Sequence, residues 1–311
     1  MGTCSSKPAL VESAGSDEGN PWIPSADPII FESTTDPVTN VLIFLHGYSM
    51  SGEVMEALFR PFFEGKKGLR VVLPTAPSTR DRMHVPVMQK HILPSVFGET
   101  MGGVAAKMFE LANPPVTSWT DDWDDIVHSE TTQKEMIEAF FTGAGGVYGK
   151  SKDLERAIEY VHELIRDQIK GGIPAYRIFV GGHSQGGFTA IRAATSFPDA
   201  PLAGFIHLSS FIANEWELEV VEAQKHMKVL KFHGTQDEII PYEICQKDLT
   251  MMQGTYPALE FVSLEGFDHA FRIFKEFKEP TSEVSSNILK FLGFEVPTKP
   301  IGPIIPFCND I

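Results

Sequence analysis

Short apolar runs, separated by polar and glycine-rich segments, recur along this 311-residue chain. Apolar runs bounded by turn signals are typical of buried strands, and alternation of apolar and polar residues is typical of strands with one covered face. We expect strands at 40–45, 69–73, 177–180, 201–208, 229–233 and 259–264. The spacing of these strands, with helical segments between them, predicts a mostly parallel sheet.

A helical period appears between Ser151 and Gly171. Leu154, Ile158 and Val161 recur on one face of that segment. Ser151 suits the N-cap, and the glycines and proline that follow end the helix. Shorter helices are expected at 188–194 and near 282–292. The pattern therefore predicts an α/β architecture, with helices flanking the sheet of a single domain at 38–293.

The pentapeptide Gly-His-Ser-Gln-Gly at 182–186 lies between the strand at 177–180 and the helix at 188–194. It matches the G-x-S-x-G nucleophile elbow, a strained turn that lifts a serine hydroxyl above the sheet. Glycines flank the serine because strand and helix approach too closely for side chains. Ser184 is therefore the candidate nucleophile.

A serine hydroxyl needs a neighbouring base, and the base needs an orienting carboxylate. In folds with this elbow the acid and then the histidine follow later strands. Asp237 follows the strand at 229–233, and His269 follows the strand at 259–264. We expect His269 to act as general base and then general acid, and Asp237 to fix its tautomer.

Other titratable residues could fill these roles. Asp268 adjoins His269, but successive side chains of an extended chain point to opposite sides. Asp248 falls inside a predicted helix. A turn aspartate that bonds its own backbone is the alternative interpretation of Asp237. Three more histidines lie in or beside predicted core strands, where a structural role is expected: His183, His207 and His233.

A tetrahedral intermediate needs preorganised donors for its oxyanion. One is expected to be the backbone N–H of Gln185, next to the nucleophile at the start of a helix. The second is expected from the loop after the strand at 40–45, where Gly47 allows a tight turn and the N–H of Tyr48 is the candidate. His46 is expected to pack or hydrogen-bond within this loop.

Several short motifs occur together: His46-Gly47, Gly172-Ile173-Pro174, Gly182-x-Ser184-Gln185-Gly186-Gly187, His233-Gly234-x-x-Asp237 before Ile240-Pro241, and Gly266-x-x-His269. As a set they resemble the acyl-protein thioesterase and carboxylesterase (lysophospholipase-type) branch of the α/β-hydrolases, over about residues 38–293. The resemblance implies the α/β-hydrolase fold and hydrolysis of long-chain acyl thioesters or esters without a cofactor.

The chain departs from the family pattern in places. The segment from Trp123 to Ile126 resembles the family's Trp-Phe-Asp-Ile beside the acyl pocket, with Asp124 in place of the aromatic residue. Many members have Phe where His183 stands. The chain is also longer than compact relatives, with insertions at about 78–122 and 126–150.

The first insertion is rich in flexible apolar residues. Methionine-rich apolar surface adapts to varied hydrophobic shapes, which suits a lid or an acyl-chain tunnel. A simple extension of the core is the alternative. The candidate acyl-pocket residues are Trp123, Met88, Phe97 and Met101.

Composition narrows the possible partners. A formal net charge of −15 argues against nucleic acid and against simple electrostatic attachment to anionic lipid. No apolar stretch is long enough to span a bilayer, and no signal-peptide core follows Met1. The 3 cysteines fit a reducing compartment better than a disulfide framework. We see no convincing metal-ligand spacing.

The first residues fit the pattern for myristoylation of Gly2, and Cys4 beside it is a candidate palmitoylation site. Two acyl chains would hold a protein stably on a membrane. We expect residues 1–37 to form a flexible, acylated leader, and residues 294–311 a C-terminal tail. The enzyme would then be cytoplasmic, at the cytosolic face of membranes. An ordinary disordered start is the alternative.

Together these features predict a serine hydrolase that removes S-palmitoyl groups from proteins. A lysophospholipase or small-ester carboxylesterase is the alternative, because the chemistry is the same. A nucleotide-binding loop at 144–151 is a poor match, because Ala144 replaces its first glycine and no strand offers the magnesium-binding aspartate. A catalytically silent receptor is disfavoured because all three triad residues are present.

Overall fold

The computed structural model describes residues 22–32, 36–80, 115–119, 152–212, 220–269, 271–277, 279 and 281–296. Several predicted residues lie outside these ranges. These are the lipidation candidates Gly2 and Cys4, the helix cap Ser151, and the acyl-pocket candidates Met88, Phe97, Met101 and Trp123.

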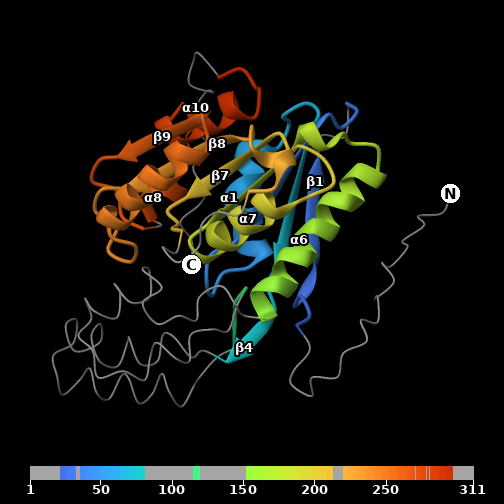
Figure 1. The fold of residues 1–311 in the computed structure, drawn as a ribbon, viewed down its shortest axis with the longest axis horizontal. Helices are drawn as coiled ribbons and strands as arrows, with labels where there is room; N and C mark the ends of the chain where they lie inside the picture. The colour runs from blue at the N-terminus through green and yellow to red at the C-terminus, as the bar shows by residue number, and fades with distance from the viewer. Residues whose placement is uncertain are drawn as a thin grey trace, which may run out of the picture.

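A seven-stranded sheet runs through the centre of the described chain, in the order β1-β3-β2-β6-β7-β8-β9 (Figure 1). Its strands are β1 (Ala26–Glu32), β2 (Asn40–Leu45), β3 (Leu69–Thr75), β6 (Ile178–His183), β7 (Gly204–Leu208), β8 (Lys228–Gly234) and β9 (Leu259–Leu264). β1 is antiparallel to β3, and every other neighbouring pair is parallel. The predicted mostly parallel sheet is confirmed.

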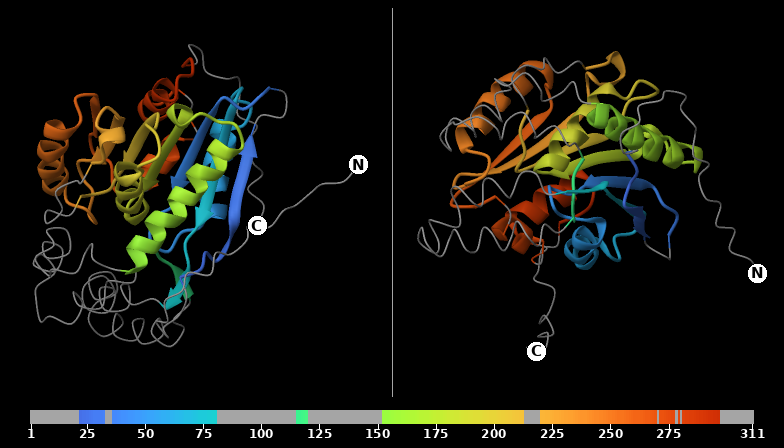
Figure 2. Two further views of the ribbon diagram at one scale, coloured as in Figure 1. Left: turned by 45° about the vertical axis from the view of Figure 1, so that its right-hand side comes forward. Right: turned by 90° about the horizontal axis from the view of Figure 1, so that it is seen from below.

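Helices cover both faces of this sheet (Figure 2). α6 (Lys152–Lys170), α7 (Gln185–Ser196) and α8 (Tyr242–Thr255) contribute to one core, and α1 (Gly52–Phe63), α9 (Phe271–Glu276) and α10 (Glu283–Phe291) to the other. Two short 3-10 helices, η2 (Ala175–Arg177) and η3 (Glu222–Gln224), precede β6 and β8. No helix in the described ranges has the length and apolar character needed to cross a bilayer.

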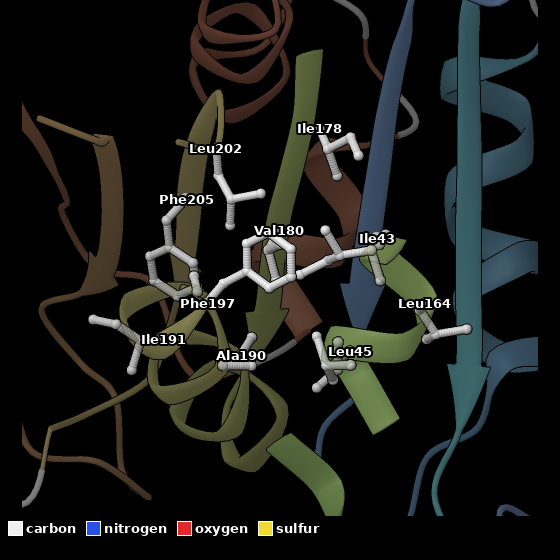
Figure 3. Close-up of a cluster of buried hydrophobic side chains, with 14 of the residues drawn as sticks. Ile43, Leu45, Leu164, Ile178, Val180, Ala190, Ile191, Phe197, Leu202 and Phe205 are labelled. Carbon is white, nitrogen blue, oxygen red and sulfur yellow. The ribbon is translucent and has the colours of Figure 1, made fainter. Parts of the chain in front are cut away.

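β2 shows why the sheet is buried on both sides. Val41, Ile43 and Leu45 pack into the core under α6 and α7, whereas Leu42 and Phe44 pack into the opposite core. Figure 3 shows Ile43 and Leu45 in the first of these cores, together with side chains of β6 and α7. Because successive side chains of a strand alternate between faces, a strand covered on both faces is apolar over most of its length.

The expected domain boundaries at residues 38 and 293 are wrong. Ala26–Glu32 was expected to be flexible leader, but it forms β1 at the sheet edge, where Ile29 is level with Leu73 of β3. Only one face of β1 is covered, so Phe31 is buried whereas Ile30 is 52% exposed. At the other end, Phe294 packs against the α10 core and donates its backbone N–H to the Leu289 carbonyl at 2.8 Å.

The ends of the expected first insertion lie side by side. β4 (Ser78–Arg80) and β5 (Pro115–Thr117) form a two-stranded antiparallel sheet, with Ser78 level with Thr117. The chain after β5 returns to the main sheet, because Trp119 is fully buried in the core under α6 and α7. This return brings residues 117–119 to the carboxyl end of β2.

Candidate active site

The candidate triad lies at one edge of the sheet. Ser184 follows β6, Asp237 follows β8 and His269 follows β9. Parallel strands present their carboxyl ends at the same edge, where ligands of open α/β sheets bind. The topology therefore brings together three side chains that are far apart in sequence.

Ser184 occupies a strained turn between β6 and α7. Its φ is 53° and its ψ is −126°, a region that side-chain-bearing residues rarely adopt. A Cβ at Gly182 would lie 2.4 Å from the backbone of Gly186, and a Cβ at Gly186 would lie 2.2 Å from the His46 carbonyl oxygen. Only glycines allow strand, helix and the loop after β2 to meet this closely.

The strained turn is held by hydrogen bonds on both sides. The Ser184 N–H donates to the Leu208 carbonyl of β7 at 3.1 Å. The Ser210 hydroxyl donates to the Ser184 carbonyl at 2.6 Å. Strain at such a residue costs about 1–3 kcal/mol and persists only where surrounding contacts over-determine the turn. These contacts fix the direction of the serine side chain.

The three predicted triad residues form a continuous hydrogen-bonded chain. His269 Nε2 lies 2.9 Å from Ser184 Oγ. His269 Nδ1 lies 2.8 Å from Asp237 Oδ2 and 3.0 Å from Oδ1. The carboxylate only accepts, so Nδ1 carries the proton and Nε2 is free to accept one from Ser184. This geometry supports proton transfer from serine to imidazole.

Asp237 is a buried carboxylate held in its ionised form. Burial is the largest influence and by itself raises its pKa, but the hydrogen bond and charge of His269 outweigh burial and leave the pKa below its usual range. Oδ1 also accepts the backbone N–H groups of Ile239 at 3.0 Å and Ile240 at 2.7 Å. Asp237 thus makes the turn bonds of the alternative interpretation as well as the bond to His269.

The neighbouring Asp268 does not contact the imidazole in this way. Its Oδ1 accepts the backbone N–H of Arg272 at 3.0 Å, at the start of α9. An aspartate there satisfies a helix-terminal donor. It is therefore a poor orienter of His269, as predicted from chain direction.

Two buried histidines hydrogen-bond to the backbone near Asp237 and His269. His183 Nε2 donates to the backbone carbonyl of His269 at 3.1 Å. His233 Nε2 donates to the Ile240 carbonyl at 2.8 Å and lies 3.4 Å from Asp237 Oδ2. Burial and then the charge of Lys231 lower the pKa of His233 to about 4. Both imidazoles hold the backbone that carries the triad, which agrees with the structural role predicted for them.

Stability should fall at acid pH because such histidines are buried as neutral rings. Burial, followed by the charge of His269, lowers the pKa of His183 to about 3 from a usual 6.5. Below its usual pKa the unfolded chain binds a proton that the folded protein does not bind. The contribution to stability is therefore complete above about pH 6.5 and is lost as the pH falls toward the lowered value.

We expect His183→Phe to weaken this acid sensitivity. Removing one such site should reduce the pH slope of the unfolding free energy by up to about 1.4 kcal/mol per unit below about pH 6.5. Urea unfolding at about pH 5 and about pH 7.5 measures the slope, with the exposed His226→Gln as the matched control. A slope equal to that of the unaltered protein would show that His183 is not held neutral.

A second buried polar cluster lies beside the elbow. The Lys231 ammonium donates to His207 Nδ1 at 2.7 Å, to the Ser210 carbonyl at 2.9 Å and to Asp248 Oδ2 at 3.4 Å. Burial raises the pKa of Asp248 to about 7, although Lys231 opposes the shift. The cluster holds the segment after β7, whose Ser210 hydroxyl bonds Ser184. Asp248 lies in α8, as expected, and does not orient His269.

The candidate oxyanion donors come from two segments beside Ser184. Gln185 is the first residue of α7, where the helix dipole favours negative charge. The loop with Tyr48 turns tightly, since the Met50 N–H donates to the Gly47 carbonyl at 3.1 Å. A Cβ at Gly47 would lie 3.3 Å from the Ser184 Cβ, so this loop lies directly against the nucleophile. The assignment of both N–H groups remains a prediction.

The tautomer of His46 follows from its two bonds. His46 Nε2 accepts the backbone N–H of Ala76 at 3.0 Å, so Nδ1 carries the proton and donates to the Gly47 carbonyl at 2.7 Å. Burial lowers the pKa of His46 to about 4. His46 therefore braces the loop after β2, in agreement with the packing role expected for it.

Ser118 and Trp119 were not predicted from the sequence to lie at the site, but they hydrogen-bond to Gln185 and His46 beside Ser184. The acyl-pocket candidate Trp123 lies outside the described residues. Trp119, which was not singled out from the sequence, lies against the loop after β2, where its indole N–H donates to the His46 carbonyl. The local sequence around Trp119 offers one indication of this role, which is that Trp119 comes two residues after the short strand β5. Within the described ranges no group of histidine, cysteine and acidic side chains is arranged to hold a metal ion.

Parts of the chain are similar in sequence to known proteins. Residues 147–277 match the model of the Phospholipase/Carboxylesterase family, and this segment contains the three triad candidates. Acyl-protein thioesterase 1 of Eremothecium gossypii is 38% identical over 96 residues, which cover 30% of this chain and 40% of that protein. Acyl-protein thioesterase 1 of Cryptococcus neoformans var. neoformans serotype D is 25% identical over 250 residues, which cover 75% of this chain and 86% of that protein.

A solved structure shows the same fold. The crystal structure of Arabidopsis thaliana SOBER1 aligns with a TM-score of 0.56 at 20% sequence identity, covering 82% of this chain and 98% of that one. At 20% sequence identity this similarity shows a shared arrangement of strands and helices. Together with the sheet order it confirms the predicted α/β-hydrolase fold.

Proposed function

We propose that this chain, whose residues 147–277 match the Phospholipase/Carboxylesterase family model, is a serine hydrolase of long-chain acyl thioesters or esters. The observation that carries the proposal is the 2.9 Å separation between His269 Nε2 and Ser184 Oγ. Both relatives described above are named acyl-protein thioesterase 1, which supports S-acylated proteins as the substrates. Cleavage of S-palmitoyl groups is thus the favoured reaction. Other similar proteins are named probable carboxylesterases, which supports the alternative given below.

Acylation begins with proton transfer from Ser184 Oγ to His269 Nε2. Oγ then attacks the acyl carbonyl carbon and forms a tetrahedral intermediate whose oxygen is negative. The intermediate collapses, the bond from carbon to sulfur or oxygen breaks, and His269 returns its proton to the leaving thiolate or alkoxide. The acyl group is left as an ester on Ser184.

Deacylation repeats these steps with water as the nucleophile. His269 Nε2 takes a proton from water, and the resulting hydroxide attacks the acyl-enzyme carbonyl. Collapse returns the proton to Ser184 Oγ and releases the fatty acid. Asp237 stays ionised throughout, keeps Nδ1 protonated and stabilises the imidazolium that forms in each half-reaction.

The oxyanion is stabilised, in this proposal, by the backbone N–H groups of Gln185 and Tyr48. Gln185 directly follows the nucleophile, and the loop with Tyr48 lies against the Ser184 side chain. One such donor contributes about 10²–10³ in turnover in serine hydrolases of this kind. No metal or cofactor is required by these steps.

Comparing three acyl substrates tests the substrate assignment. We expect kcat/KM for a palmitoyl-cysteine peptide to exceed that for a lysophospholipid and a short-chain ester by about tenfold or more, a difference of about 1.4 kcal/mol. The matched control is the same peptide with palmitate on serine, which separates thioester preference from chain-length preference. A higher value for the lysophospholipid or the short ester would favour the alternative function, a lysophospholipase or small-ester carboxylesterase.

Attachment to membranes is a further part of the proposal. It is supported by the match of the first residues to the myristoylation pattern at Gly2 and by the adjacent Cys4. Two acyl chains would keep the enzyme where S-acylated proteins reside. Such a position, at the cytosolic face of a membrane, would raise the local concentration of its substrates.

A further inference from the structure

Residues 117–119 contact both segments that carry the candidate oxyanion donors. One segment is the loop after β2, which contains Tyr48, and the other is the start of α7, which contains Gln185. The two segments are far apart along the chain, because β2 ends at Leu45 and α7 begins at Gln185. Pairing of β2 with β6 fixes where each segment starts, and residues 117–119 add hydrogen bonds to both segments beyond the ends of these strands.

The first contact is made by the side chain of Gln185. Its Oε1 accepts the backbone N–H of Trp119 at 3.1 Å. Its Nε2 donates to the Ser118 hydroxyl at 2.9 Å. Gln185 as a whole residue is 2% exposed, so both bonds are protected from water. The first turn of α7 is thus fastened to residues 118 and 119.

The second contact is made by the indole of Trp119. Its Nε1–H donates to the backbone carbonyl of His46 at 2.8 Å, and its ring lies against the His46 imidazole with centroids 5.0 Å apart. The same His46 carbonyl oxygen is the atom that forbids a side chain at Gly186. Trp119 therefore helps to fix the position of the loop after β2 relative to the turn at Ser184.

The third contact joins the far side of that loop to β5. The Ser49 N–H donates to the Thr117 carbonyl at 3.0 Å, and the Thr117 hydroxyl donates to the Met50 carbonyl. Ser49 has a φ of 63°, so this loop is itself in a conformation that needs support. Tyr48 lies between two anchored positions, His46 and Ser49.

We propose that Trp119 and the side chain of Gln185 are positioning residues for the oxyanion hole. They hold the loop after β2 and the start of α7 at a fixed separation, so that the N–H groups of Tyr48 and Gln185 converge on one point above Ser184. Neither side chain touches the reacting atoms. The inference rests on the proposed hydrolase activity and assigns to these residues a role in transition-state binding.

The reason for a kinetic effect is geometric. Oxyanion donors act when they lie within about 3 Å of the position that the charged oxygen will occupy, and preorganisation removes the cost of moving them during reaction. Loosening this clamp, by which we mean the contacts of Trp119 and of the Gln185 side chain, displaces donors that the ground-state substrate does not need. The loss should therefore appear in kcat and not in KM.

Trp119→Phe is the direct test, because it removes the indole N–H and keeps an aromatic ring in the core. We expect kcat to fall by about 10- to 100-fold with KM changed less than about threefold, below the full loss of one donor. A trifluoromethyl ketone, which binds as an oxyanion adduct of serine, should weaken by the same factor as kcat/KM. Fluorophosphonate titration counts the folded sites in each preparation.

Trp22→Phe is the matched control. The Trp22 indole N–H donates to the backbone carbonyl of Trp119 at 3.4 Å and is not the donor to the His46 carbonyl, which is the Trp119 indole. The control therefore removes one indole N–H that bonds to Trp119, and it leaves the bonds of Trp119 to His46 and Gln185 in place. We expect its kcat and its inhibitor affinity to stay within about twofold of the unaltered enzyme.

Gln185→Met gives a second test that is independent of the core tryptophan. It removes both bonds of the side chain to residues 118 and 119 and keeps the backbone N–H. We expect a loss of the same size as in Trp119→Phe, and a double variant that loses less than the product of the two, because both act through one segment.

Three results are decisive. Losses in kcat matched by the inhibitor, with Trp22→Phe unaffected, support the clamp. Equal kcat in all variants overturns it, as does a loss confined to KM or shared by Trp22→Phe. Lack of turnover in the unaltered enzyme would refute the proposed hydrolase instead. In that case equal fluorophosphonate labelling rates of Ser184 in all variants would overturn the clamp separately.

Discussion

Replacing Ser184 or His269 by alanine is expected to lower turnover by about 10⁶-fold. Without Oγ no acyl-enzyme forms, and without the imidazole the hydroxyl keeps its proton at neutral pH. The 2.9 Å separation between His269 Nε2 and Ser184 Oγ is the geometric basis of this expectation. Turnover of a palmitoyl thioester peptide, measured against the uncatalysed rate, tests it.

The two losses should not multiply. Because Ser184 and His269 act in one step, the double variant should be about as slow as either single variant. The residual rate over water comes from the oxyanion hole and substrate binding. The exposed His226→Ala serves as the control and should keep full activity. Loss of less than about 100-fold in Ser184→Ala would contradict a serine mechanism.

The second large effect is expected for Asp237→Asn, which should lower kcat by about 10⁴-fold. The Asn amide presents a donor to His269 Nδ1, so the imidazole proton moves to Nε2. In that tautomer Nε2 points a proton at Ser184 Oγ and cannot act as base. The fold should survive, because Asn keeps an oxygen that can accept the backbone N–H groups of Ile239 and Ile240.

Asp268→Asn is the matched control for this variant. Asp268 adjoins His269 in sequence but its carboxylate accepts the Arg272 N–H, a bond that Asn can also make. We expect turnover within about threefold of the unaltered enzyme. A large loss in Asp268→Asn together with a small loss in Asp237→Asn would exchange the assigned roles of the two aspartates.

The strands of the sheet centre could be predicted because their signal is local. The run at 40–45 is apolar from Val41 to Leu45, and it forms β2 (Asn40–Leu45). The triad could be predicted because each member follows a strand and their order is fixed by the fold. In both cases the residues next to each position in the sequence are enough to predict its place in the fold.

The elements at the edges gave weaker signals. β1 contains Asp27 and Pro28 and buries only one face, so it resembles loop by composition. α1 was not predicted at all. It begins after the cap Ser51 and continues through Pro61, a residue that in sequence indicates a break. Packing of its phenylalanines against the sheet outweighs that local cost.

The clamp around the oxyanion hole could not be found from sequence. The bond between Gln185 and Trp119 joins residues that are 66 positions apart, and the bond between Trp119 and His46 joins residues 73 apart. No periodicity or motif links them. The contact of Trp119 with the loop after β2 depends on the path of the chain after β5, which only the three-dimensional structure gives.

Trapping the acyl-enzyme tests the central claim most directly. The purified protein is mixed briefly with a palmitoyl thioester, quenched in acid, digested, and its peptides are analysed by mass spectrometry. We expect the palmitoyl group on Ser184, formed in a burst that His269→Ala abolishes. Palmitate on another residue, or turnover without any acylated serine, would contradict the account.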